Sequence, residues 1–416
     1  MAYLARAVDR GLESLLHAMG AVLIEGARGC GKTSTGLQHS RSSLRLDSSP
    51  QLIELASLNP AELLRGDAPR LIDEWQLAPA LWNVIRHEID DRQLPGQFIL
   101  SGSASPSEDV TRHSGAGRFA RLRMRPMSLA ESQRSTSEVS LGALGGDIQV
   151  SGTSPLSYAD LAVEAVRGGW PALLAATRTD ALMFNRSYID DLCTTDIHLA
   201  TGVRHDSVRM RRLLESASRN ISSEATLTNI ARDVSADGGQ LNAETVRTYL
   251  DGLARVFALE ELPAWSVALR SKSRLRTSSK LHLADPALAC AALGIGAERL
   301  AGDPEFFGQV FEAMVIRDLR SLSSAEQGRV YHYRDNTGLE VDAILEYPDG
   351  RWAAVEVKLG SGRIPEAESS LLTLRDHRVD LNRVGRPAFL AIVTGTQYAY
   401  TLPSGVQVVP LGVLGV

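Results

Sequence analysis

The sequence predicts a multidomain protein of the α/β class. Short apolar strands alternate with helical segments over residues 1–157, the pattern over 158–300 is mainly helical, and mixed strands and helices return over 301–416. The length of 416 residues exceeds that of one ordinary hydrophobic core and favours two or three domains. We therefore expect an N-terminal α/β domain, a helical middle region and a C-terminal α/β domain.

The composition is typical of a globular chain. Hydrophobic residues make up 44% and the net charge is −5, so any nucleic-acid binding needs a local basic patch. A run of about 18 apolar residues is absent, and the first residues mix charged with apolar side chains, unlike a signal peptide. The cysteines (Cys30, Cys193 and Cys290) are far apart, which suits a reducing compartment. We expect a cytoplasmic protein without a membrane partner.

Lysine is rare in this chain. Of the 44 basic residues four are lysines, at positions 32, 272, 280 and 358, and the others are arginines. Because a compact ammonium group differs chemically from a planar guanidinium group, each lysine indicates a position with particular chemistry. Lys32 and Lys358 fall in the motifs described next.

A nucleotide-binding motif follows the first strand, which we expect at 21–25. The residues Gly-Ala-Arg-Gly-Cys-Gly-Lys-Thr at 26–33 fit the P-loop pattern G-x-x-x-x-G-K-[ST] before a helix. The glycines allow successive backbone N–H groups to face phosphates. Lys32 is expected to bind the β and γ phosphate oxygens during catalysis and Thr33 to bind Mg²⁺. The predicted cofactors are ATP and Mg²⁺, with the nucleotide bound by Gly26, Gly29, Cys30, Gly31, Lys32, Thr33 and Ser34.

Further strands are expected at 43–47, 70–74 and 97–101. The strand at 70–74 ends in two acids, of which Asp73 is placed to hold Mg²⁺ and Glu74 to activate the attacking water as general base. Glu74 is therefore the second expected catalytic residue. Ser101 or Ser103 could contact the γ-phosphate or the attacking water as a sensor, although a plain loop serine is the alternative. Arg118 is a candidate charge-stabilising group, either in cis or from a neighbouring subunit, although a solvated arginine is the alternative.

Several motifs resemble those of one family. Leu-Ile-Asp-Glu-Trp-Gln at 71–76 and Phe-Ile-Leu-Ser-Gly-Ser at 98–103 look like the AAA-type ATPases of bacteria and archaea that carry a C-terminal domain of unknown function 4143. Later motifs agree, and the resemblance spans nearly the whole chain: Gly-Gly-Trp-Pro at 168–171, Lys-Leu-His-Leu-Ala-Asp at 280–285, Gly-Leu-Glu-Val-Asp at 338–342 and Val-Glu-Val-Lys at 355–358.

The middle region contains a stretch that resembles a winged helix. Helices are expected at 227–234 and 242–257, separated by a glycine-containing turn at 237–239. The second helix has an apolar stripe on one face and polar and basic residues on the other, as DNA-reading helices and packing modules both do. A basic stretch follows with every-second spacing, either as a wing or as a solvated hairpin: Arg270, Lys272, Arg274 and Arg276.

The C-terminal region carries a second constellation of charged residues. Asp342 lies on one strand of a hairpin, and Glu356 and Lys358 share a face of the returning strand because strand side chains alternate. Asp, Glu and Lys at such a hairpin are typical of restriction-endonuclease-like folds, where they bind Mg²⁺ and activate water. Glu312, on the preceding helix, resembles the fourth acid of that fold. A catalytically silent scaffold is the alternative, since residues 301–416 carry 11 basic and 15 acidic residues.

We therefore expect three domains: an AAA-type P-loop ATPase domain (1–157) that ends in a flexible Ser/Gly-rich linker (133–157), a helical region with a winged-helix-like module (158–300) and a restriction-endonuclease-like α/β domain (301–416). The leading hypothesis is an ATPase switch that couples nucleotide state to the C-terminal modules. The alternatives are an ATP-regulated, metal-dependent nuclease and an ATP-controlled DNA-binding regulator. DNA, RNA or another protein is the candidate partner, and an oligomer is compatible with an AAA domain.

Overall fold

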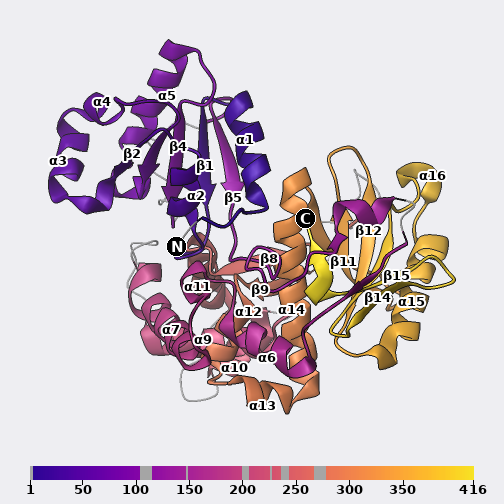
Figure 1. The fold of residues 1–416 in the computed structure, drawn as a ribbon. Helices are drawn as coiled ribbons and strands as arrows, with labels where there is room; N and C mark the ends of the chain where they lie inside the picture. Colours follow the sequence, from indigo (N-terminus) through magenta and orange to yellow (C-terminus); the bar gives the residue numbers. More distant parts are fainter. Residues whose placement is uncertain are drawn as a thin grey trace.

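The expected α/β class is confirmed by the three regions that follow one another along the chain (Figure 1). The turn expected at 237–239 and the basic stretch at 270–276 lie outside the described residues. This computed structural model describes residues 3–103, 115–146, 149–198, 206–224, 227–235, 243–266 and 278–416.

A five-stranded parallel sheet forms the centre of the N-terminal domain, in the order β2-β3-β4-β1-β5. Because all strands run in one direction, their carboxyl ends meet at one edge of the sheet, where ligands of such sheets bind. The expected strands recur within two residues of their predicted ends, whereas β5 was not expected. The strands are β1 (Ala21–Glu25), β2 (Ser42–Arg45), β3 (Arg70–Asp73), β4 (Phe98–Gly102) and β5 (Phe119–Arg123).

Helices cover both faces of this sheet. Val22 and Ile24 of β1 pack with Leu12 of α1, whereas Leu23 packs on the other face with Ile85 of α5. This alternation follows from the two-residue period of a strand and explains why β1 is apolar throughout. The helices are α1 (Val8–Ala18), α2 (Lys32–Gln38), α3 (Pro50–Leu58), α4 (Pro60–Leu63) and α5 (Leu81–Arg92).

The middle region is helical, with one two-stranded antiparallel ribbon. The apolar stripe expected on the second helix of the winged-helix-like stretch is buried, since Val246 and Leu253 are fully covered. The elements are α6 (Tyr158–Arg167), α7 (Arg178–Asp191), α9 (Ser207–Arg219), α10 (Leu227–Ser235), α11 (Ala243–Arg255), β8 (Leu259–Leu262), β9 (Lys280–Leu283), α12 (Pro286–Ala292) and α13 (Ala297–Ala301).

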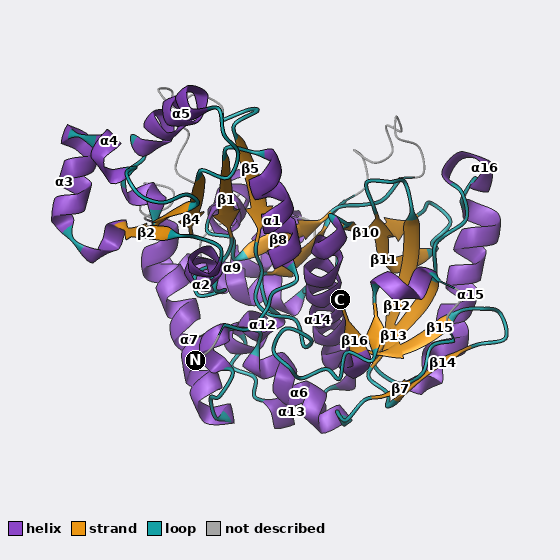
Figure 2. Ribbon diagram, turned by 45° about the horizontal axis from the view of Figure 1, so that its top comes forward, coloured by secondary structure: helices purple, strands orange, loops and turns teal. Residues whose placement is uncertain are grey.

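The C-terminal domain is built on a seven-stranded mixed sheet, in the order β10-β11-β12-β13-β15-β14-β7. The strands β12, β13 and β15 are parallel, and the flanking pairs are antiparallel (Figure 2). The elements of the domain are α14 (Pro304–Leu322), β10 (Arg329–Arg334), β11 (Glu340–Glu346), β12 (Trp352–Lys358), α15 (Ile364–Thr373), α16 (Leu381–Val384), β13 (Leu390–Thr394), β14 (Tyr398–Thr401), β15 (Gln407–Pro410) and β16 (Leu414–Gly415).

The segment expected to be a flexible linker, 133–157, instead contributes two short strands to the C-terminal domain. β7 (Gly152–Thr153) pairs with β14 at the edge of the sheet, and β6 (Val139–Ser140) pairs with β16 near the C-terminus. Its polar composition suits the edge position, where half of the backbone groups face solvent. Residues that precede the middle region in the chain are therefore part of the C-terminal domain.

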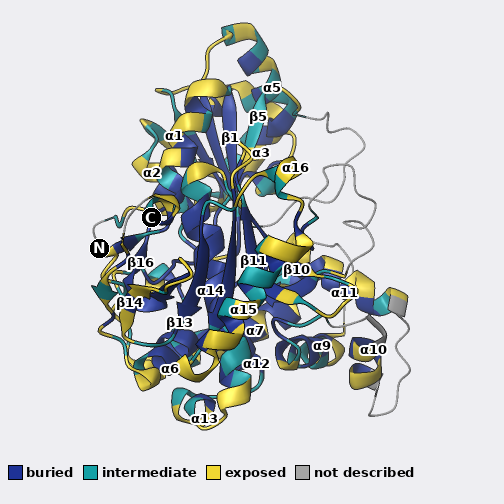
Figure 3. Cartoon of the chain, turned by 90° about the vertical axis from the view of Figure 1, so that its right-hand side faces the viewer, coloured by how far each residue is buried: buried dark blue, intermediate teal, exposed yellow. Residues whose placement is uncertain are grey.

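Helix α14 is the common core element of the molecule. It packs against α6, α12 and α13 of the middle region and against β10 and β12 of the C-terminal sheet. Most of its residues from Phe307 onward are buried, as its dark colour in Figure 3 shows. A movement of α14 would therefore change packing contacts in both the middle region and the C-terminal sheet. Among the described helices, none combines the length and the apolarity that a membrane crossing requires.

Candidate functional site

The P-loop lies at the carboxyl edge of the N-terminal sheet, between β1 and α2. Gly29 and Gly31 have φ angles of 76° and 107°, which residues with a Cβ rarely adopt. A Cβ on Gly26 would lie 2.0 Å from the carbonyl oxygen of Met124. The loop thus needs glycine at all three positions, and its backbone N–H groups lead into the N-terminus of α2, an anion-binding arrangement.

The side chains expected to bind Mg²⁺·ATP converge beside this loop. The Lys32 ammonium group donates to the carbonyl oxygens of Gly26 and Ala27, at 2.9 Å each. The Thr33 hydroxyl donates to both carboxylate oxygens of Asp73 at 3.0 Å, and the Ser101 hydroxyl donates to the same carboxylate. The side chains of Thr33 and Asp73 offer oxygen atoms as metal ligands, and Mg²⁺ prefers oxygen ligands. The residues present therefore fit a Mg²⁺ ion at Thr33 and Asp73.

Glu74 directly follows β3 in a left-handed backbone conformation, with φ of 55°. This conformation is uncommon for a non-glycine residue and costs free energy, and such residues concentrate at functional sites. The Gln76 amide donates a hydrogen bond to the Glu74 carboxylate. This bond orients the carboxylate at the same edge as the P-loop.

The remaining expected nucleotide and sensor residues have different locations. Ser34 is exposed in the first turn of α2, and Ser103 lies one residue beyond β4 at the P-loop edge. Arg118, by contrast, precedes β5, and its carbonyl oxygen accepts from Ala21 at the start of β1. It therefore lies at the opposite end of the sheet, where its guanidinium is paired with Asp90 at 2.9 Å. Arg118 therefore does not reach the P-loop of its own chain in this arrangement, and its action from a neighbouring subunit stays a prediction.

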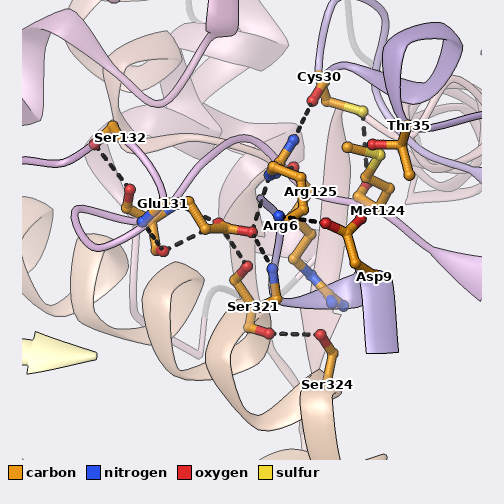
Figure 4. A network of polar contacts seen from close by, with 12 residues as sticks. Arg6, Asp9, Cys30, Thr35, Met124, Arg125, Glu131, Ser132, Ser321 and Ser324 are labelled. Atoms are coloured by element: carbon orange, nitrogen blue, oxygen red, sulfur yellow. Dashed lines mark hydrogen bonds and ion pairs between the residues drawn. The ribbon is translucent and has the colours of Figure 1, made fainter. Parts of the chain in front are cut away.

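A buried polar network connects the P-loop to α14 (Figure 4). Arg6 donates to the carbonyl oxygens of Cys30 in the loop and of Arg125, at 2.9 and 2.8 Å, and pairs with Glu131 at 2.9 Å. The hydroxyl of Ser321, on α14, donates to the other oxygen of Glu131 at 2.9 Å. Burial opposes ionisation, but the charge of Arg6 holds the pKa of Glu131 below its ordinary value. The P-loop and α14 thus both contact this buried ion pair of the N-terminal domain.

The Gly-Gly-Trp-Pro motif packs against the same loop. The position of a Cβ on Gly31 would be 3.4 Å from Pro171, and that on Gly29 would be 4.0 Å from the Trp170 ring. The Tyr188 hydroxyl, on α7, donates to the carbonyl oxygen of Arg28 at 3.2 Å. The middle region therefore forms one wall of the nucleotide loop.

The C-terminal constellation gathers around the start of β11 and the end of β12. The Lys358 ammonium lies 2.6 Å from Glu356 and 3.6 Å from Asp342. Glu312, from α14, joins them through Lys280 of β9, whose ammonium lies 2.9 Å from Glu312 and 4.0 Å from Asp342. All four residues expected from the sequence are thus brought together.

Lys280 is the member of this cluster that the sequence reasoning missed. The signal that could have found it is the scarcity of lysine, since Lys32, Lys280 and Lys358 all lie at the two candidate sites. The alternating pattern around Lys280 predicts a strand, but it does not indicate which carboxylates the lysine contacts. Its pairing depends on α14 and β11, which are far away in the chain.

Burial dominates the electrostatics of the carboxylate cluster. Burial, and then the charge of Asp342, raise the pKa of Glu312 to about 7 and raise the pKa of Glu356 well above its ordinary value. The two lysines balance the acids in part. Within the described residues, no group of three or more His, Cys, Asp or Glu side chains is arranged to hold a metal ion. Lys280 and Lys358 are the cations that contact these carboxylates.

Comparison with known protein families confirms the resemblance inferred from the motifs. Residues 19–133 match an AAA domain, residues 158–299 match the domain of unknown function 8612 and residues 307–414 match the domain of unknown function 4143. The chain carries an AAA-type P-loop ATPase domain followed by a domain of unknown function 4143. It is thus an ATP-binding protein of the ATPase class.

Two curated relatives, uncharacterized proteins of Mycobacterium bovis and Mycobacterium tuberculosis, are each 28% identical over 417 residues, which cover 96% of this chain and 82% of theirs. Among solved structures, the Walker-type ATPase of Pyrococcus abyssi is 14% identical with a TM-score of 0.42, over 68% of this chain and 94% of its own. The ORC1 protein of Aeropyrum pernix in complex with DNA is 11% identical with a TM-score of 0.29, over 70% of this chain and 92% of its own. Such low TM-scores carry no argument about function.

The raised pKa of Glu312 predicts a pH-dependent stability. Because its pKa rises from 4.5 in the unfolded chain to about 7, the stabilisation it gives is complete below about pH 4.5 and is lost as the pH rises through 7. The free energy of unfolding of Glu312→Gln, relative to the parent, should therefore increase over this range. Urea unfolding in a chelating buffer at a series of pH values measures it, with the exposed Glu366→Gln as the control. A difference that does not change with pH would contradict the prediction.

Proposed function

We propose that this chain is a Mg²⁺-dependent ATPase switch in which the nucleotide state of the P-loop changes the position of the C-terminal domain. The observation that carries this proposal is the contact of Arg6 with both the Cys30 carbonyl oxygen and Glu131. Glu131 also accepts a hydrogen bond from Ser321 of α14. A shift of the loop backbone would therefore change the hydrogen bonds that hold this helix in position.

The geometry supports the following roles for the residues. Lys32, which donates to two carbonyl oxygens, would donate to phosphate oxygens of the bound nucleotide, and Thr33 and Asp73 would hold the ion. Mg²⁺ bound with the nucleotide would neutralise the charge that develops on the γ-phosphate. Glu74 accepts the proton of the attacking water, and Ser101 keeps the Asp73 carboxylate in place.

Lys32→Ala and Glu74→Gln should separate binding from hydrolysis. Lys32→Ala should lose ATP binding without unfolding, because it removes the cation that pairs with the phosphates. Glu74→Gln should still bind ATP but hydrolyse it about 10²–10⁴-fold more slowly, since the general base is removed. Calorimetric titration with ATP and a phosphate-release assay measure the two effects. Glu62→Gln, an exposed change of the same kind, is the control, and unchanged ATP binding by Lys32→Ala would refute the site assignment.

The coupling route can be tested with two serines on neighbouring turns. Ser321→Ala removes the hydroxyl that donates to Glu131, whereas Ser324→Ala removes one that donates to the carbonyl oxygen of Ser321. ATP should change hydrogen exchange along α14 in the parent and in Ser324→Ala, and this change should be at least halved in Ser321→Ala, because a net hydrogen bond to a charged group contributes about 1.5–3 kcal/mol. Equal responses of both variants would exclude this route.

A second candidate function, a metal-dependent nuclease, is favoured by the convergence of Asp342, Glu356, Lys358 and Glu312. The two lysines argue against it, since a divalent cation would have to compete with them for the same carboxylates. If the cluster is a nuclease site, single-stranded DNA should be cleaved in Mn²⁺, and Asp342→Asn should abolish cleavage. Asp349→Asn, in an exposed turn, is the matched control. The absence of cleavage in the parent would leave the domain as a scaffold.

The third hypothesis, a DNA-binding regulator, stays a prediction. Helix α11 presents Arg247 to solvent as a reading helix would. The turn and the wing that the hypothesis also needs lie outside the described residues. The winged-helix assignment, the restriction-endonuclease-like fold, the oligomeric state and the cytoplasmic location likewise stay predictions.

A further inference from the structure

A large cleft separates the N-terminal and C-terminal domains. Its volume is about 1030 Å³. One wall is formed by α1 and β5 of the N-terminal domain, and the other by the end of α14, the start of β10 and the end of β11. The residues that line it include none of the P-loop or of the carboxylate cluster, so the cleft is distinct from both candidate sites.

The lining of this cleft is strongly basic although the whole chain has a net charge of −5. It contains a single acidic residue, Glu346, among the described residues that line it. Against this acid stand five arginines: Arg121, Arg123, Arg125, Arg320 and Arg329.

Three of these arginines share one carboxylate. Glu260, on β8, lies 3.2 Å from Arg123, 2.9 Å from Arg125 and 3.0 Å from Arg320. The guanidinium of Arg123 also lies over the ring of Phe257, 4.0 Å from its centre. Because three positive charges face one negative charge in a half-buried place, the group is short of anions. A second anion in the cleft would be stabilised there.

The other two arginines extend the basic surface outward. Arg121 pairs with Glu25 but remains 55% exposed, and Arg329 is exposed without an ion pair in the described part of the chain. Arg121, Arg123 and Arg125 occupy every second position along β5 and its extension, so that they recur at intervals of roughly 6.6 Å. This repeat suits a ligand whose negative charges also repeat, such as a polymer.

We propose that this cleft binds the phosphodiester backbone of a single nucleic-acid strand. The guanidinium fork matches phosphate oxygens in a bidentate way. A volume of about 1000 Å³ is at the upper end for pockets that enclose small ligands, so it holds a few nucleotides of one strand and not a duplex. The proposal goes beyond the ATPase switch and does not depend on it.

The test uses the two exposed arginines, because their loss leaves the core intact. Fluorescence anisotropy with a labelled single-stranded oligothymidylate, and with an oligouridylate of the same length, should show binding that weakens with salt. Arg121→Gln combined with Arg329→Gln should weaken binding about tenfold or more and reduce the slope of log K against log salt by about two. Arg65→Gln combined with Arg383→Gln, which removes the same charge from exposed sites elsewhere, should leave binding unchanged.

Four results would overturn the proposal. The first is no binding of either oligonucleotide, or binding that does not change with salt. The second is an equal loss in the cleft variant and in its control. The third is a loss confined to Arg247→Gln, which would place the nucleic acid on α11. The last is competition by a duplex, or by inorganic tripolyphosphate at equal phosphate concentration, as strong as that of the single strand itself.

Discussion

The arrangement of the domains around the nucleotide loop depends on the buried ion pair between Arg6 and Glu131. Both side chains are at most 4% exposed, and transferring two charges from water costs several kcal/mol per ion unless their hydrogen-bonding groups are satisfied. Here they are, since Arg6 also binds two carbonyl oxygens and Glu131 also accepts from Ser321 and from backbone N–H groups. Removal of one partner should cost about 3–5 kcal/mol. The loop and α14 therefore both contact this one buried ion pair.

A second buried charge group fixes the middle region to the same helix. Arg317 of α14 pairs with Asp285 at 2.8 Å and with Asp318 at 2.7 Å. Asp285 accepts from the backbone N–H of Gly169 at 2.9 Å. A Cβ on Gly169 would lie 2.0 Å from the carbonyl oxygen of Met127, so the chain requires glycine here. The Gly-Gly-Trp-Pro motif thus packs against the P-loop, and Asp285 joins this motif to α14.

The parts of the site that the sequence predicts are those in which the chemistry is local. The P-loop and the acids after β3 depend on residues that are adjacent or share one sheet edge, and the Glu356–Lys358 pair follows from strand alternation. The partners of Lys280 and Arg6 could not be predicted, because they are 32 and 125 residues away and only tertiary packing brings them together. The strands β6 and β7 were missed for another reason: a strand of two residues is too short to show an alternating pattern, and only its partner strand defines it.

The carboxylate cluster and the basic cleft both contact the ribbon formed by β8 and β9. Lys280 and His282 share a face of β9, and Glu260 is the cross-strand neighbour of His282. Lys280 thus faces the carboxylates while Glu260 faces the arginines of the cleft, about 6.6 Å further along the ribbon. Between them, burial and then the charges of Arg320 and Lys280 lower the pKa of His282 well below its ordinary value, so the imidazole is neutral. The carboxylate cluster and the arginines of the cleft are thus bound by neighbouring positions of one two-stranded ribbon.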